Sequence, residues 1–277
     1  MVKTPQISCK ALTCELGFGA MIKTSNTVFC QAARRFHITV FWLVSAFMLL
    51  TSLALTQIVI AQELKPISIR YTVSFESEKY GSATLGRFET QLSQAKDGGY
   101  RIKSALQGQG IAAILMGSNY QESCDFSIEN GRAISNDYAG GRKALEDYQV
   151  KFDWTERLIN FSDGESLDMP KGYVVDNCNM FFAAALLKGE GLSEQPLYIV
   201  DGKNKRIRGY NLRSTTNEIL STNFGDINTL KIVLERELQP DRTISLWLAP
   251  ENSYMPLKME ERRRKRTTTM IVDQINN

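Results

Sequence analysis

The chain has 277 residues, with 33 lysine and arginine residues against 30 aspartate and glutamate residues, so its formal net charge is only +3. All of that excess belongs to the first 61 residues, which hold five basic residues and one acidic residue. The remainder has 28 basic and 29 acidic residues and gives no reason to expect a nucleic-acid partner. The single histidine is His37, so histidine-dependent catalytic triads and dyads are excluded from everything that follows it, and zinc there would have to rely on two thiolates and carboxylates.

The first element in chain order is an apolar segment of 24 residues without a formal charge, from Ile38 to Ala61. At a rise of about 1.5 Å per residue, a helix of this length covers the roughly 30 Å hydrocarbon core of a bilayer. Arg34 and Arg35 stand directly before it, and a basic flank orients such a segment with its N-terminus in the cytoplasm. We therefore expect a cytoplasmic n-region at 1–37, a signal peptide or a retained signal anchor at 38–61, and an exported domain at 62–277 in the bacterial periplasm.

Alternation of apolar and polar side chains dominates the exported part. Ile67, Ile69, Tyr71, Val73 and Phe75 share one face of a predicted strand, and the same pattern recurs at 148–154, 230–234, 244–248 and 255–259. Turn signals separate such segments: Asp97-Gly98-Gly99, Asn130-Gly131, Gly140-Gly141, Asp163-Gly164, Asp201-Gly202 and Pro240-Asp241. The sequence predicts roughly a dozen antiparallel strands in a curved sheet or incomplete β-barrel.

Two segments favour helices. Asp176 or Asn177 can cap a helix from Asn179 to Lys188 that Gly189 ends, and because its interior is apolar on all sides, we expect it to be buried. Residues 111–116, between Gly110 and Gly117, predict a short second helix that also needs apolar cover. Residues 189–196 read as a linker and as a possible internal division of the domain.

Aromatic side chains suggest a ligand cavity. Trp247 stands among small residues on its strand face, which is typical either of ordinary core packing or of a cavity wall. The candidate cavity lining consists of Trp247, Trp154, Phe181 and Phe182. Only Cys124 and Cys178 follow the apolar segment, and they are either a disulfide formed in an oxidising compartment or two buried free thiols.

Charged residues give weaker signals. Basic residues cluster at 203–213 and at 262–266, and Arg262, Arg264 and Arg266 are candidate contacts to lipid phosphate or to an anionic envelope polymer. The alternative is a solvated strand edge that discourages strand addition. The carboxylates available for a glycosidase-like pair are Asp147, Asp153, Asp168, Asp176, Glu260 and Glu261, and nothing in the sequence selects among them.

The order of several short motifs resembles a known family. Phe152-Asp153-Trp154 precedes the capped apolar helix, and after it come the segments 222–226, 230–232, 246–250 and 254–258, which read TNFGD, LKI, LWLAP and YMPLK. Over most of 65–265 this order is similar to the domain of unknown function 3108 family of bacterial envelope proteins. The resemblance implies an exported, mostly antiparallel β protein and supplies no catalytic residues. Family members carry an aspartate followed shortly by a serine before the helix, where this chain has Asp176-Asn177-Cys178.

The leading functional hypothesis is a non-catalytic periplasmic β protein that binds a hydrophobic or amphiphilic envelope molecule, such as a lipid, in a cavity closed by the apolar helix. A structural or assembly partner of another envelope protein is the second hypothesis, and a histidine-free, carboxylate-dependent hydrolase is the third. No catalytic residue, cofactor or metal site is predicted, and membrane contact is expected only through 38–61 if this segment is retained.

Overall fold

The computed structural model describes residues 64–95, 98–110, 119–142, 147–188 and 192–276, all within one compact unit that spans Ala61–Asn277. The predicted leader at 1–61, the predicted second helix at 111–116 and the first residues of the predicted linker lie outside the described residues. In the described ranges no helix combines the length and the apolar character that a bilayer crossing requires.

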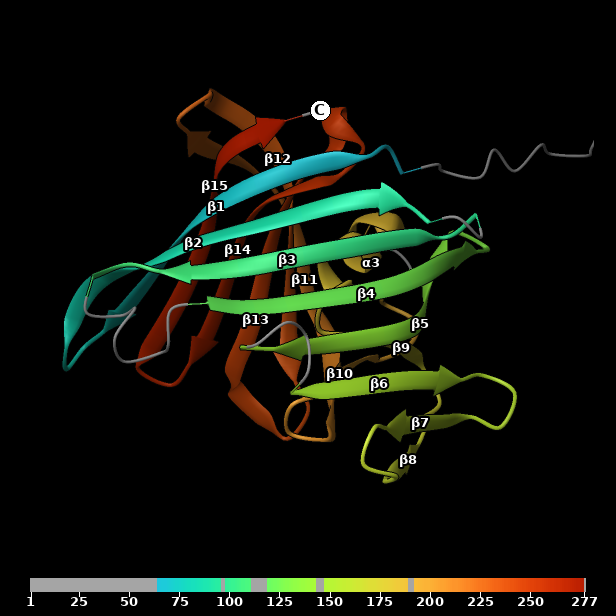
Figure 1. Ribbon diagram of the computed structural model, residues 1–277. Coiled ribbons are helices and arrows are strands. Elements are labelled where there is room, and N and C mark those ends of the chain that lie inside the picture. The colour runs from blue at the N-terminus through green and yellow to red at the C-terminus, as the bar shows by residue number, and fades with distance from the viewer. Residues whose placement is uncertain (1–63, 96–97, 111–118, 143–146, 189–191, 277) are drawn as a thin grey trace, which may run out of the picture. The chain divides into compact units, whose positions relative to one another are not determined.

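Fifteen strands and one α-helix make up the described fold (Figure 1). The first eight strands are β1 (Ile67–Ser77), β2 (Gly81–Gln94), β3 (Tyr100–Gly108), β4 (Asn119–Glu129), β5 (Arg132–Gly141), β6 (Tyr148–Asp153), β7 (Leu158–Phe161) and β8 (Ser166–Asp168). The remaining elements are β9 (Tyr173–Asp176), α3 (Met180–Leu187), β10 (Leu197–Asp201), β11 (Arg206–Thr222), β12 (Gly225–Arg236), β13 (Gln239–Ala249), the 3-10 turn η1 (Pro250–Asn252), β14 (Met255–Arg263) and β15 (Arg266–Asn276).

All fifteen strands belong to one sheet, in the order β8-β7-β6-β5-β4-β3-β2-β1-β15-β14-β13-β12-β11-β10-β9. Each strand pairs antiparallel with its neighbour in the sheet, except that β9 and β10, joined through α3, are parallel. Strands β8 and β9 follow each other in the chain but lie at opposite edges of the sheet. The first and last strands, β1 and β15, pair with each other in its centre. The predicted mainly β, curved antiparallel fold is therefore confirmed, with fifteen strands rather than a dozen.

The sheet curls around α3. Figure 1 shows the helix between a wall that contains β2, β3 and β4 and a second wall that contains β10, β11 and β13. Where the walls approach each other, β5 faces β9, and the backbone N–H of Ala133 donates to the hydroxyl of Tyr173 at 2.8 Å. The concave face of one sheet thus becomes the inside of an incomplete barrel.

The helix is short and almost fully buried. Seven of its eight residues are buried, and only Phe181 is partly accessible. The Asp176 carboxylate accepts the backbone N–H groups of Cys178 at 2.9 Å and Asn179 at 2.8 Å, which satisfies donors that precede the first turn. At the other end Lys188 adopts a left-handed conformation, and its N–H bonds to the carbonyl oxygens of Ala184 and Ala185. The predicted helix is present, and its predicted acidic cap acts just before the first turn.

Candidate functional site

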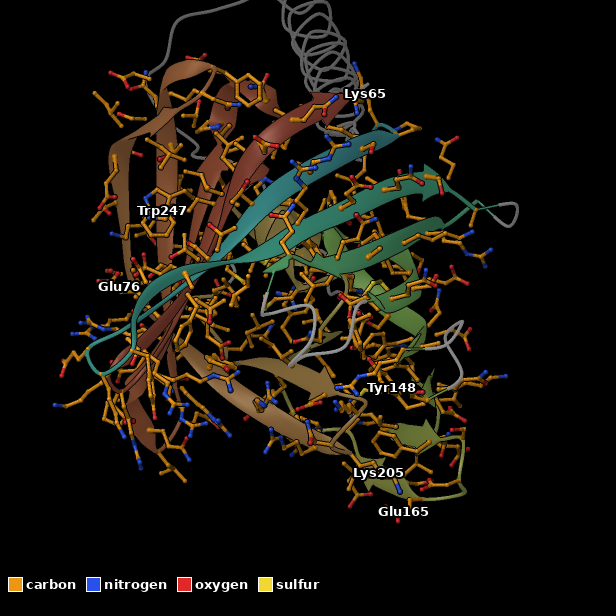
Figure 2. The ribbon with its side chains drawn as sticks, turned by 60° about the vertical axis from the view of Figure 1, so that its left-hand side comes forward. Lys65, Glu76, Tyr148, Glu165, Lys205 and Trp247 are labelled. Carbon is orange, nitrogen blue, oxygen red and sulfur yellow. A yellow bond between two sulfur atoms is a disulfide. The ribbon has the colours of Figure 1, made fainter. Side chains whose placement is uncertain are left out.

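Two cavities lie on the concave side of the sheet, and neighbouring residues of α3 face different ones. Phe182 and Ala185 line the larger cavity, of about 810 Å³, and Met180 and Phe181 line the smaller, of about 380 Å³. Successive helical residues are rotated by about 100°, so one all-apolar helix can supply a wall to both. Figure 2 shows Lys65, which borders the larger cavity, well apart from Tyr148, which borders the smaller.

The larger cavity, called here the apolar cavity, has walls that come from both ends of the described chain. Its apolar lining includes Leu64, Ile67, Leu92, Phe182, Ala185 and Met255. Phe224, in the turn between β11 and β12, also lines it and remains 52% exposed. A half-exposed phenylalanine beside an apolar cavity is a surface that a ligand could cover.

The smaller cavity, called here the polar cavity, contains a chain of hydroxyl groups that ends at a buried carboxyl group. The Tyr120 and Tyr148 hydroxyls are 2.5 Å apart, the Tyr148 hydroxyl donates to that of Tyr138 at 2.8 Å, and the Tyr138 hydroxyl donates to Glu122 at 3.3 Å. Burial raises the pKa of Tyr120 to about 12 and that of Tyr138 well above its ordinary value. The phenols therefore stay protonated at neutral pH, and each hydroxyl donates its one proton along the chain toward Glu122.

Glu122 is the carboxyl group of this chain. Its side chain is buried on the inner face of β4, and burial, followed by the charge of Asp176, raises its pKa from 4.5 to about 7, although the hydrogen bond from Tyr138 acts in the opposite direction. A buried carboxyl group that titrates near neutrality beside a cavity is typical of functional sites.

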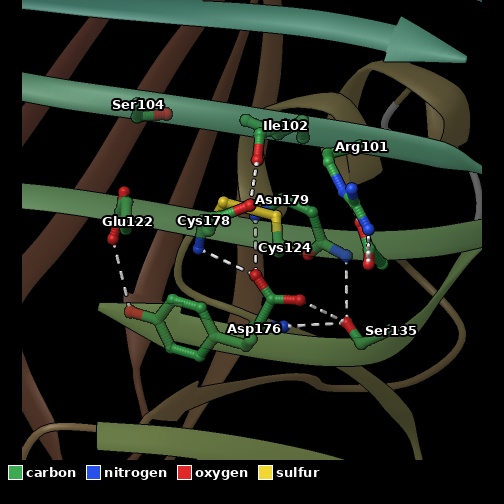
Figure 3. Close-up of a disulfide and its surroundings, with 12 residues drawn as sticks. Arg101, Ile102, Ser104, Glu122, Cys124, Ser135, Asp176, Cys178 and Asn179 are labelled. Atoms are coloured by element: carbon green, nitrogen blue, oxygen red, sulfur yellow. Dashed lines mark hydrogen bonds and ion pairs between the residues drawn. A yellow bond between two sulfur atoms is a disulfide. The ribbon is translucent and has the colours of Figure 1, made fainter. Parts of the chain in front are cut away.

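The disulfide and its surroundings hold α3 in place (Figure 3). Cys124 on β4 is bonded to Cys178, two residues before α3, with their Cα atoms 6.1 Å apart. Asp176 lies beside this bond, accepts the Ser135 hydroxyl at 2.7 Å, and has a pKa that burial raises to about 6 against the effect of its hydrogen bonds. Ligand atoms of both cysteines and Asp176 lie within 4.8 Å of one another, but in this state the sulfur atoms are in a disulfide, so we assign the group a structural role.

Arginine side chains also line the polar cavity. Asp201, at the end of β10, accepts Arg206 Nε at 3.1 Å and also pairs with Arg208. On β14, Arg263 pairs with Glu261 at 2.6 Å, and both line the same cavity. Apolar residues, tyrosine hydroxyl groups and guanidinium groups thus share one cavity.

The predicted cavity residues separate into two groups. Phe181 and Phe182 line the polar and the apolar cavity, respectively. Trp154 lines neither of these cavities: its indole N–H donates to the Ser135 carbonyl oxygen at 2.8 Å. Trp247 also lines neither: its indole N–H donates to Glu218 at 2.9 Å, and the Lys231 and Lys258 ammonium groups lie 4.7 and 4.2 Å from its ring centre.

The predicted anion contacts lie beside the cavity residues rather than among them. Arg262, Arg264 and Arg266 are exposed around the β14–β15 hairpin, whereas Arg263 lines the polar cavity. Alternate residues of a strand point to opposite faces, so a shift of one position decides which arginine faces the inside.

Of the six predicted carboxylates, only Glu261 lines the polar cavity, and Asp176 is buried beside the disulfide. Asp147 and Asp153 accept nearby backbone N–H groups, Asp168 ends β8, and Glu260 pairs with Lys258. Glu122 and Asp201 line the cavity but were not predicted. Glu122 had a detectable signal, because it interrupts the alternating inward series of Tyr120, Cys124 and Phe126 on β4.

The fold and the cavities define a class of protein, an open antiparallel sheet that curls around an apolar helix and encloses an interior with both apolar and polar walls. A family model described as "Protein of unknown function (DUF3108)" matches residues 70–270, and the chain belongs to this family. No curated protein sequence matches the chain.

The chain is also similar to solved structures, the first of which supports the fold. The β-barrel-like protein of domain of unknown function DUF1849 from Brucella abortus is 12% identical, with a TM-score of 0.50, and the match covers 77% of this chain and 98% of that one. The MucA/MucB complex of Pseudomonas aeruginosa matches with 14% identity over 76% of this chain and 51% of that one, at a TM-score of 0.33. A Vibrio parahaemolyticus domain described as an outer membrane lipoprotein-sorting protein domain matches with 8% identity over 78% of this chain and 86% of that one, at a TM-score of 0.29.

Proposed function

We propose that this protein binds an amphiphilic molecule of the bacterial envelope in the interior of its curled sheet. The observation that carries the proposal is the apolar cavity of about 810 Å³, which lies within the roughly 300–1,000 Å³ typical of small-molecule sites. Its walls include Phe182 and Ala185 of an all-apolar helix, and Phe224 at its border is half exposed. An acyl chain would remove this apolar surface from water.

The polar cavity on the other side of α3 supports an amphiphilic ligand rather than a purely apolar one. Tyrosine hydroxyls and guanidinium groups line it together with Met180 and Phe181. We propose binding rather than catalysis because the cavity's carboxylates are already engaged: Asp201 and Glu261 in ion pairs with arginine, and Glu122 with Tyr138. The segment predicted at 38–61 would direct the protein to the periplasm, where the protein would be released if this segment is a signal peptide or anchored in the membrane if it is a signal anchor.

Native mass spectrometry of the full chain, purified from envelopes under mild conditions, tests the proposal. The expected result is a mass above that of the polypeptide, together with a lipid in the organic extract. A bare polypeptide mass, an extract without lipid and no uptake of the apolar probe N-phenyl-1-naphthylamine would overturn it. A stable co-purifying polypeptide in place of a lipid would favour the alternative role in envelope assembly.

Two exposed apolar residues provide a matched pair of variants. Phe224→Ser removes apolar surface at the border of the apolar cavity and should weaken probe binding by about fivefold, as expected for a phenyl ring that a ligand partly covers. Leu238→Asn changes a fully exposed residue in the β12–β13 turn, where a left-handed φ of 59° suits asparagine, and should leave binding unchanged. If both variants change probe binding equally, the apolar cavity is not the binding site.

A further inference from the structure

Five arginines gather on the inner face at one end of β11–β14. Arg206 and Arg208 alternate with their neighbours on β11, so they share a face with Tyr210, which lines the polar cavity. Tyr210 pairs directly with Arg236 on β12, and Arg242 on β13 pairs directly with Arg263 on β14. Directly paired residues of antiparallel strands share a face, so the row of Arg206, Arg208, Arg236, Arg242 and Arg263, called here the arginine row, crosses four neighbouring strands.

The charge of this row is only partly compensated. Asp201 pairs with Arg206 and Arg208, and Glu261 pairs with Arg263, but no described carboxylate forms an ion pair with Arg236 or Arg242. Two arginines directly opposite each other repel, which costs stability unless an anion lies between them.

Two further observations indicate an absent acceptor. Arg208 Nε is buried and has no hydrogen-bond partner among the described residues, although Arg208 lines the polar cavity. A buried donor without an acceptor is costly in a folded protein. Burial and then the charges of Arg242, Arg208 and Arg206 lower the pKa of Arg236, which is the expected effect of crowded guanidinium groups.

We propose that the arginine row binds the phosphate group of an anionic amphiphile, a ligand assignment that rests on the proposed function. Guanidinium groups pair with phosphate oxygens through two parallel hydrogen bonds, and a phosphate monoester offers three such oxygens. Arg236, Arg242 and the free Nε of Arg208 supply donors for them. Met180 and Phe181 line the polar cavity together with Arg208, and they give the first part of the apolar chain a surface to contact.

Binding of soluble short-chain probes to the full chain tests this assignment. Dioctanoyl phosphatidic acid has both acyl chains and a phosphate group. Dioctanoylglycerol has the acyl chains without the phosphate, and inorganic phosphate has the anion without acyl chains. The wild-type protein should bind the phosphatidic acid at least tenfold more tightly than dioctanoylglycerol, and inorganic phosphate should compete with it. If neither amphiphile binds, the proposed function itself fails; if both bind equally, only the arginine assignment fails.

A double variant and its control locate the site. Arg236→Gln with Arg242→Gln should abolish the preference for the phosphate while leaving dioctanoylglycerol binding unchanged, which also reports that the variant is folded. Arg262→Gln with Arg266→Gln removes the same charge from exposed positions and should retain the preference. The proposal is overturned if the exposed control variant loses the preference for phosphatidic acid and the Arg236/Arg242 variant keeps it. It is also overturned if inorganic phosphate binds as tightly as phosphatidic acid, since the ligand would then be free phosphate.

Discussion

Glu122 should make the protein less stable as pH rises from about 4.5 to about 7. Burial raises its pKa from 4.5 to about 7, so between these values the folded state holds a proton that the unfolded state has released. Stability is therefore highest below about pH 4.5 and falls until about pH 7, because deprotonation leaves a carboxylate buried beside Asp176. The rise from 4.5 to about 7 corresponds to about 3 kcal/mol of unfolding free energy.

Glu122→Gln tests this reasoning, because glutamine keeps the shape and can still accept the Tyr138 hydroxyl. At pH 4 the variant should match the wild type, and at pH 8 it should be more stable by about 3 kcal/mol, or about 6–12 °C in Tm for a unit of this size. Urea and thermal unfolding followed by circular dichroism at both pH values measure the difference. Glu129→Gln, an exposed change on the same strand, is the control. Parallel stability curves for wild type and Glu122→Gln would refute the assignment of a buried, neutral carboxyl group.

Two further perturbations test how the site is held. Replacing Cys124 and Cys178 together by alanine opens a loop with a sequence separation of 54 residues and should cost about 4 kcal/mol in urea unfolding; a midpoint equal to that of the oxidised wild type would show that the bond does not form. Gly202→Ala would place a methyl carbon 2.6 Å from the Tyr148 ring and 2.9 Å from a Val150 methyl group, and should cost about 1–3 kcal/mol, a loss that should shrink in a Tyr148→Ala background.

Much of the fold could be predicted because its signals are local. Tyr148, Val150 and Phe152 alternate with polar residues, and β6 buries these three side chains as that pattern requires. Strands β8 and β9 are only three and four residues long, too short for an alternating pattern to show, and all four residues of β9 are buried. The pairing of β1 with β15 has no local signal, since it joins segments about 200 residues apart, as in the Arg70–Gln274 hydrogen bond.

The site was harder to predict because its residues depend on which face of each strand is inside. Met259, Glu261 and Arg263 alternate along β14 and all line the polar cavity, so the inner arginine of this strand could have been chosen over its neighbours by extending the alternation from Met259. The same rule places Trp247 opposite the inward leucines of β13. Asp201 could not have been found this way, because its role depends on arginines that reach it from β11.

The pairing of β1 with β15 sets the order in which this sheet can be completed. The strand synthesised early must wait, unpaired on one side, until the last strand has emerged, since the two lie next to each other in the middle of the sheet. A pairing of such long sequence separation slows folding and leaves a temporary edge open to other chains. Removing β15 would therefore divide the structure at its centre, whereas removing β8 would only trim its margin.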